Sequence, residues 1–209
     1  MVVTLAIHAE PKRDDPRDRA SNMIETREIS GFSAIEIHGV GEVFITQGER
    51  ESLTIESDDH ILPLIESAVE GGTLSLGPKR GSRIRDVKRL VYTLTVTNLA
   101  SITHDGEGVT TVTGLSVDAL TVTLRGAGDF TISGQARSQT INLQGASAYN
   151  GRDFATAQTS VNLQGAGDVT VQVSDALSIS ISGVGNVTYY GDPAVTRRIA
   201  GVGVIKQGR

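Results

Sequence analysis

A repeat of about twenty residues dominates the second half of the chain. The pentapeptide Asn-Leu-Gln-Gly-Ala occurs at residues 142–146 and again at 162–166. Weaker copies flank it, and each copy has a leading glycine. A fixed period of this length is typical of a solenoid, in which each repeat forms one coil stacked on the coil before it. The leading glycines, 18 to 20 residues apart, are Gly106, Gly126, Gly145, Gly165, Gly183 and Gly201.

Apolar residues alternate with polar ones on both sides of each leading glycine. A period of two indicates β-strands with one buried face, and the frequent Gly, Thr, Ser, Val and Ile fit short strands joined by tight turns. Equivalent residues of stacked coils lie about 4.8 Å apart. The sequence therefore predicts an all-β, parallel β-helix-like solenoid with about 18–20 residues per coil. Its inward column two residues before each glycine contains Leu124, Leu143, Leu163 and Ile181.

The chain divides into a short extension and one domain. Residues 10–20 carry charges of both signs, two prolines and almost no apolar side chain, as a solvated linker does. The apolar segment at residues 2–7 is shorter than the apolar core of a signal peptide, and no Lys or Arg precedes it. We expect an N-terminal extension or linker over residues 1–23 and a single β-helix-like domain over residues 24–209.

One short helix is predicted near residues 59–69. Asp58 and Asp59 precede the segment and can cap it, while Pro63 falls in its first turn. Gly71 and Gly72 end it. We expect this helix to cover a sheet face or one end of the stack, because an open end exposes apolar side chains and unpaired strand edges. The apolar residues at helical spacing are Ile61, Leu62, Ile65, Ala68 and Val69.

Composition argues against several classes of partner. The formal net charge is −5, only 4% of the residues are aromatic and Trp is absent, so neither a basic footprint nor a base-stacking surface for nucleic acid is expected. No apolar run is long enough for a transmembrane helix. Cysteine is absent, the four histidines are scattered, and the calcium-binding nonapeptide signature is missing. We expect no metal and no cofactor.

Four polar residues hold the same place in the repeat and are the candidate site residues: Glu42, Asp129, Asp168 and Asn186. Asp129 and Asp168 belong to coils two steps apart, which places them about 9–10 Å from one another. That separation is near the upper limit for the two carboxylates of an inverting glycosidase. The preferred interpretation is structural, because Asp and Asn favour turns.

Two further groups of polar residues bear on binding. Asn142 with Asn162, and Gln144 with Gln164, are expected to form amide ladders along the stack. Residues 79–89 carry six positive side chains and one negative. An exposed loop is the preferred interpretation of this segment, and a contact for an anion, polysaccharide or lipid headgroup is the alternative.

The chain resembles a known bacterial family over about residues 24–207. The similar segments are residues 27–32, 37–48, 55–59 and 71–74, the Gly-Ala-Gly-Asp sequences at 126–129 and 165–168, and residues 183–187 with 190–193. They resemble the putative auto-transporter adhesin, head GIN domain family, a domain of unknown function. The resemblance implies a right-handed β-helix-like domain in the cell envelope or outside the cell, with no recognised catalytic residues.

These observations favour a non-enzymatic, adhesin-like binding domain of the cell envelope or of a secreted protein. The expected ligand is a carbohydrate or an envelope protein, bound along a polar face of Thr, Ser, Asn and Gln. One alternative is a polysaccharide-degrading β-helix enzyme that uses Asp129 and Asp168. A second alternative is a structural scaffold, a homo-oligomer assembled through a coil end or edge.

Overall fold

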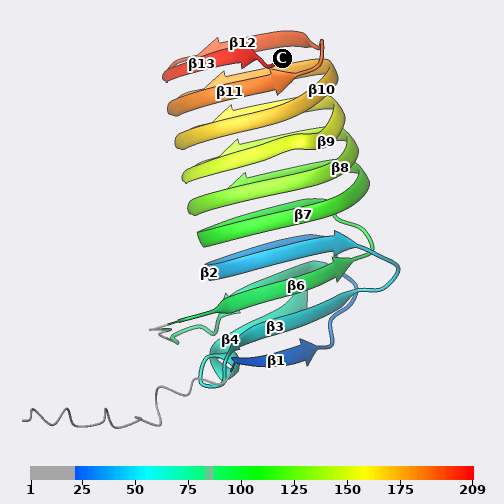
Figure 1. Cartoon of the computed structure of the whole chain (residues 1–209), viewed down its shortest axis with the longest axis vertical. Coiled ribbons are helices and arrows are strands. Elements are labelled where there is room, and N and C mark those ends of the chain that lie inside the picture. Colours follow the sequence, from blue (N-terminus) through cyan, green and yellow to red (C-terminus); the bar gives the residue numbers. More distant parts are fainter. Residues whose placement is uncertain (1–21, 83, 85–86) are drawn as a thin grey trace, which may run out of the picture.

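The structure is a computed structural model that describes residues 22–82, 84 and 87–209. It is a stack of coils wound from one thirteen-stranded sheet, with its strands running across the long axis of the molecule (Figure 1). The strands are β1 (Asn22–Arg27), β2 (Ala34–Gln47), β3 (Ser52–Asp58), β4 (Ile65–Glu70), β5 (Thr73–Pro78), β6 (Leu90–Val96), β7 (Ser101–Leu124), β8 (Ala127–Leu143), β9 (Ala146–Leu163), β10 (Ala166–Ile181), β11 (Val184–Tyr190), β12 (Ala194–Ile199) and β13 (Val202–Gln207).

The solenoid begins at β2 and continues to the last strand, with every pair from β2–β7 to β11–β13 parallel. β7 is longer than one coil, so its end stacks on its own start. The backbone N–H of Thr121 donates to the carbonyl of Ala100 at 2.9 Å, and that of Arg125 donates to His104 at 2.9 Å. Each coil thus has two long sides, one before and one after the leading glycine. We call them the first side and the second side.

The predicted inward column is confirmed. Leu124 pairs with Leu143, Leu143 with Leu163, and Leu163 with Ile181, and each side chain is at most 3% exposed. Burying one such side chain contributes roughly 1.5–3 kcal/mol before the entropy cost of ordering it. No coil can bury these residues alone, which explains why the pattern recurs through the whole stack.

The corner at the leading glycines has no room for a side chain. A Cβ on Gly145 would overlap with the carbonyl oxygen of Gly126 in the coil below, and a Cβ on Gly165 would overlap with that of Gly145. The φ angle of Gly145 is not in the left-handed region. Glycine is therefore needed at this position because the backbones of adjacent coils lie too close together for a Cβ, and not because of the φ angle.

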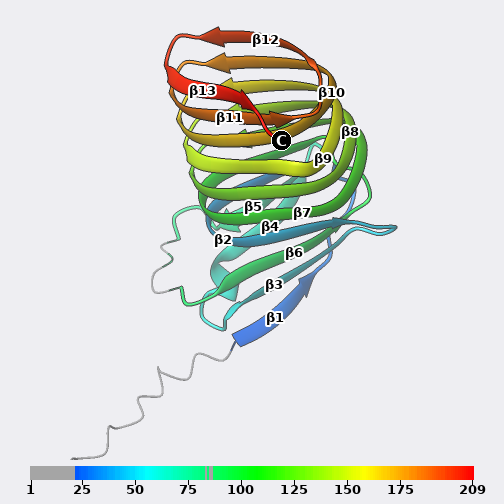
Figure 2. The same ribbon diagram turned by 45° about the horizontal axis from the view of Figure 1, so that its top comes forward.

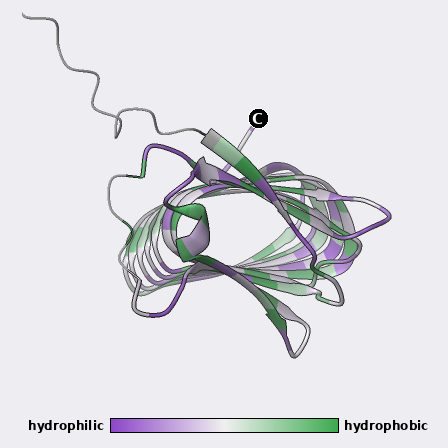
Figure 3. Ribbon diagram, turned by 90° about the horizontal axis from the view of Figure 1, so that it is seen from below, coloured by the Kyte–Doolittle hydropathy of each residue, from purple (hydrophilic) through white to green (hydrophobic). Residues whose placement is uncertain are grey.

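The helix predicted near residues 59–69 is wrong. The segment contains only a single 3-10 turn, η2 (Leu62–Leu64), followed by β4, which forms an antiparallel hairpin with β5. Gly71 and Gly72 have φ angles of 55° and 79° and make the two-residue turn of this hairpin. A cover at one end of the stack is nevertheless present, because the turn η2 lies over part of that end (Figure 3). Ile61 and Leu62 of this segment are buried.

The N-terminal end is completed by two additions, each of which joins β2 through a parallel strand and continues in antiparallel ones. On the first side, β5 pairs with β2 and β4 pairs with β5; on the second side, β6 pairs with β2, β3 with β6, and β1 with β3. The predicted extension lies outside the described residues except for Asn22 and Met23, which begin β1. Arg83, Arg85 and Asp86 of the predicted basic loop also lie outside them. Arg89 of that loop pairs with Glu56 at 2.9 Å.

Candidate binding surface

Two columns of polar side chains cover the outside of the first side. We call these eight residues the polar face. They alternate along each strand with the buried column that contains Leu124 and Leu143, so the same register that builds the core also builds the polar face. The columns are Thr121, Thr140, Ser160 and Ser178, and beside them Thr123, Asn142, Asn162 and Ser180.

Hydrogen bonds along the stack order the amides of the polar face. Asn162 donates from Nδ2 to Oδ1 of Asn142 at 3.0 Å, and Asn142 donates from Nδ2 to Oγ1 of Thr123 at 3.4 Å. The predicted asparagine ladder is thus present. Gln144 has a different partner, because its Oε1 accepts a hydrogen bond from Nε of Arg125 at 3.3 Å. The amides of Asn142 and Asn162 are fixed in direction before any ligand arrives.

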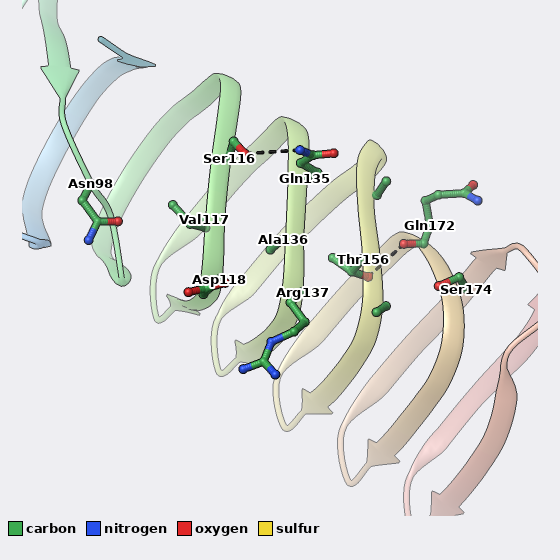
Figure 4. Close-up of a pocket in the computed structure, with 12 residues that line it drawn as sticks. Asn98, Ser116, Val117, Asp118, Gln135, Ala136, Arg137, Thr156, Gln172 and Ser174 are labelled. Atoms are coloured by element: carbon green, nitrogen blue, oxygen red, sulfur yellow. Dashed lines mark hydrogen bonds between the residues drawn. The ribbon is translucent and has the colours of Figure 1, made fainter. Parts of the chain in front are cut away.

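A groove runs along the stack axis beside the polar face, across β7, β8, β9 and β10 (Figure 4). We call it the side groove; its volume is about 750 Å³. Its lining combines small side chains with polar ones and includes one acid, Asp118, and one base, Arg137. The other lining residues are Asn98, Ser116, Val117, Gln135, Ala136, Ala155, Thr156, Ala157, Gln172 and Ser174.

The side groove lies where the strands bend between the second side and the next first side. The ladder register shifts here in the pairs β7–β8, β8–β9 and β9–β10, for example between Val112 and Leu115 and between Thr131 and Ser133. Such bulges bend a strand and re-aim its side chains. Gln135 donates to Oγ of Ser116 at 3.3 Å, and Thr156 donates to the carbonyl of Gln172 at 2.9 Å. These bonds tie neighbouring coils together along the groove.

The candidate residues predicted from the repeat share one register column on the second side, away from the side groove. Glu42 pairs with Val109, which pairs with Asp129. Ala148 separates Asp129 from Asp168, as the two-coil spacing requires. Asp168 and Asn186 do meet: Oδ1 of Asp168 accepts hydrogen bonds from the backbone N of Asn186 at 3.2 Å and from its Nδ2 at 2.8 Å.

Asp129 and Asp168 have different surroundings. Asp129 borders a void of about 10 Å³ at the glycine corner, together with Phe130 and Ser147. Asp168 is held by Asn186 in the next coil. The two carboxylates thus stand two coils apart on one ladder, with Ala148 between them, and neither lines the side groove.

His104 occupies an inward position, between Ile37 and Leu124 of the buried column. It is 6% exposed, and its Nδ1 lies 2.9 Å from Oγ1 of Thr110. Nε2 is buried without a hydrogen-bond partner among the described residues. Burial lowers the pKa of the imidazole, against the opposing effect of Asp105, and His38 lowers this pKa further. His104 is a neutral core residue and is not part of the binding surface.

Within the described part of the chain, no three acidic or histidine side chains gather closely enough to hold a metal ion. A search of the same residues for a helix with the length and apolar character needed to cross a membrane also finds none.

Comparison with known proteins adds a family and a fold. The family model described as putative auto-transporter adhesin, head GIN domain, matches residues 31–193. Among curated proteins no match is found. A putative adhesin from Bacteroides fragilis has a similar solved structure, with 24% identity and a TM-score of 0.76 over 90% of this chain and 97% of that one.

Two further solved structures share the fold at lower similarity. A putative adhesin from Parabacteroides merdae is 16% identical with a TM-score of 0.53, over 91% of this chain and 98% of that one. A putative lipid binding protein from Parabacteroides distasonis is 18% identical with a TM-score of 0.52, over the same shares.

Proposed function

Because the chain belongs to the putative auto-transporter adhesin, head GIN domain family, we propose that residues 24–209 form one non-enzymatic binding domain of the cell envelope or of a secreted protein. The ligand is an extended carbohydrate that lies along the side groove and the polar face. The observation that carries this proposal is the side groove itself, a polar channel that crosses β7 to β10.

The chemistry of the groove suits a sugar polymer. A saccharide offers hydroxyl groups that both donate and accept, and the lining offers amides in Gln135 and Gln172 and hydroxyls in Ser116 and Ser174. Ala136, Ala155 and Ala157 contribute only methyl groups, which leave the groove open for a ligand. The same lining suits an acyl chain poorly, because Val117 is its largest aliphatic side chain. The solenoid interior is filled by its own buried residues and offers no room for lipid.

The absence of enzymatic activity is supported by the placement of the candidate carboxylates. A glycosidase needs an acid and a base that face one substrate from two sides. Asp129 and Asp168 lie on the second side, outside the side groove, and Asp168 is engaged by Asn186. A carbohydrate in the groove would therefore be held and not cleaved.

A glycan array with a matched pair of variants tests the proposal. Ala155 and Ala146 are exposed alanines of the same strand, β9, but only Ala155 lines the side groove. Ala155→Trp fills the groove and should abolish glycan binding, while Ala146→Trp, at the glycine corner, should bind like wild type. Binding that survives Ala155→Trp would remove the groove from the proposal.

A pull-down from envelope extracts, with the same two variants, decides between carbohydrate and protein ligands. Capture of a protein that Ala155→Trp abolishes and Ala146→Trp preserves would replace the carbohydrate by an envelope protein. An empty array together with an empty pull-down would refute the binding function. Cleavage of a bound glycan would release new reducing ends. If Asp129→Asn or Asp168→Asn abolished that release, the result would favour the polysaccharide-degrading enzyme.

A further inference from the structure

The side groove is built from one short segment of each coil that it crosses. β7, β8, β9 and β10 lie one above another as successive turns of the stack (Figure 2). Ser116 pairs with Gln135, Gln135 with Ala155, and Ala155 with Gln172. The groove is therefore a row of four subsites, one per coil, whose lining residues fall within 116–118, 135–137, 155–157 and 172–174.

The parallel ladder sets the distance between these subsites. Neighbouring strands of a sheet lie about 4.8 Å apart, so a ligand that follows the stack axis meets a new coil at each such step. The polar face has the same spacing, because Thr140, Ser160 and Ser178 are register partners in three of these coils. A polymer makes equivalent contacts along its whole length only if its own repeat matches this distance.

An extended peptide does not have this repeat. Its side chains on one face lie two residues apart, about 6.6–6.8 Å, so a peptide laid along the groove falls out of register with the coils within two steps. A protein partner could contact the groove, but it could not repeat the same contact from coil to coil with one extended strand.

A β-1,4-linked sugar chain does have this repeat. When pyranose rings are joined from carbon 1 to carbon 4 through equatorial bonds, each ring advances the chain by nearly the distance between two coils. Alternate rings are turned over, but a glucose-type ring has hydroxyl groups on both edges, so every coil meets a group that can donate and accept. An α-1,4 linkage instead winds the chain into a helix, whose rings turn away from a straight groove.

The charge of the groove favours an uncharged polymer. Within the described lining, Asp118 is the one acid and Arg137 the one base, so their charges cancel. A polymer with a carboxylate on every sugar would place a negative charge beside each coil, and Arg137 could neutralise only one of them. The formal net charge of the chain, −5, would repel such a polymer as well.

We propose that the ligand is an unbranched, uncharged, β-1,4-linked polysaccharide that lies parallel to the stack axis with one sugar per coil. This inference rests on the proposed function and adds the linkage, the direction and the register of the ligand. The groove crosses four coils, so four sugars fill it. Because the contacts repeat along one ligand chain, affinity rises with chain length until the last coil of the groove is occupied.

A series of oligosaccharides tests this register with the wild-type protein. β-1,4-linked oligomers of glucose and of N-acetylglucosamine, from two to eight sugars long, are titrated by isothermal calorimetry. Each added sugar should tighten binding severalfold up to four sugars, and further sugars should add little. The matched control is the α-1,4-linked series of glucose oligomers, which should show no such rise.

A chain with one additional coil tests the same register from the side of the protein. Residues 145–164 form one complete repeat, and duplicating them creates a Gln-Gly-Ala junction like those at 144–146 and 164–166. The duplication adds a second copy of segment 155–157 to the groove, so the rise in affinity should continue to five sugars. Circular dichroism and urea unfolding show whether the longer chain is folded, and the wild-type series decides the matter if it is not.

The outcomes separate this inference from the proposed function. The register of one sugar per coil is overturned by affinity that does not depend on length, by equal binding of the α-1,4 series, or by a folded duplicated chain that still levels off at four sugars. It is also overturned if the β-1,4 oligomers fail to bind while the glycan array identifies another glycan. In each of these cases a carbohydrate-binding domain remains. An empty array together with no binding of any oligomer would refute the carbohydrate ligand itself.

Discussion

The ring of Tyr149 stacks on the ring of Phe130 inside the solenoid, with centroids 5.4 Å apart and an angle of 12° between the planes. The two residues are register partners in adjacent coils. The Tyr149 hydroxyl accepts a hydrogen bond from Nε2 of Gln139, another buried side chain. The core thus contains a polar group with a partner. Tyr92 offers the contrast, because its buried hydroxyl has no partner among the described residues.

This contrast predicts opposite effects for the same substitution. Tyr149→Phe leaves the Gln139 amide buried and unpaired, which should lower the free energy of unfolding by about 1–3 kcal/mol. Tyr92→Phe removes an unpaired buried hydroxyl and should leave stability unchanged or raise it by about 1 kcal/mol. Urea denaturation at pH 7 measures both. Equal losses in the two variants would show that Tyr92 also has a partner.

Both tyrosines make the fold sensitive to alkali. Burial raises the pKa of the Tyr149 and Tyr92 phenols, with Gln139 and Arg27 opposing the shift respectively. The unfolded chain releases these protons near pH 10 and the folded chain does not, so stability is intact below pH 10 and falls as the pH rises beyond it. A denaturation midpoint measured from pH 8 to 11 should fall less steeply in Tyr92→Phe. An identical slope would assign the alkaline loss to other groups.

The stacked column predicts a large cost for a single truncation. Leu143 is fully buried between Leu124 and Leu163. Leu143→Ala should lower the free energy of unfolding by about 2–5 kcal/mol, because the coils above and below cannot collapse into the cavity. The next residue, Gln144, is exposed, so Gln144→Ala should cost less than about 0.5 kcal/mol. Similar midpoints for the two variants in urea would contradict the packing of this column.

The solenoid could be predicted because inward residues recur at fixed offsets from each glycine, as Leu143 and Leu163 do. The N-terminal end could not be predicted in the same way, because it does not repeat. Residues 61–69 have helical spacing, but Val69 pairs with Leu74 and Glu70 with Thr73 across a hairpin. The sequence did contain a signal for this hairpin, namely Gly71 and Gly72 as a two-residue turn between residues 65–70 and 73–78. Tertiary pairing there outweighs a local helical pattern.

The side groove escaped prediction for a different reason. Its residues lie past the bulges, where the residue count from the leading glycine varies between coils. Gln135, Ala155 and Gln172 are register partners, yet they stand nine, ten and seven residues after Gly126, Gly145 and Gly165. Alignment at a constant offset cannot bring them together. Asn142 and Asn162 each lie three residues before a leading glycine. Because this spacing is the same in both coils, alignment on the glycines predicted their ladder.

Two glycine substitutions separate the roles of space and of backbone conformation. Gly145→Ala would drive a methyl group into the Gly126 carbonyl and should cost about 3 kcal/mol or more. Gly114 has a φ angle of 67°, and no atom lies within 4 Å of the place that a methyl group would take there. Gly114→Ala should therefore cost only the left-handed strain, about 1–2 kcal/mol. Thermal denaturation of both variants checks the order, and a smaller loss for Gly145→Ala would contradict the close approach of the coils.

His104 predicts a loss of stability in acid. Burial holds the pKa of its imidazole below the usual value of about 6.5. The unfolded chain therefore binds a proton that the folded chain does not, so stability is complete above pH 6.5 and falls as the pH drops below it.

His104→Leu/Thr110→Val replaces both hydrogen-bonding partners by apolar groups in an apolar column. Its denaturation midpoint should change less between pH 7 and pH 5 than that of wild type. His60→Gln, at an exposed histidine, should keep the wild-type pH dependence, and a double variant that also keeps it would exclude His104 as the titrating group.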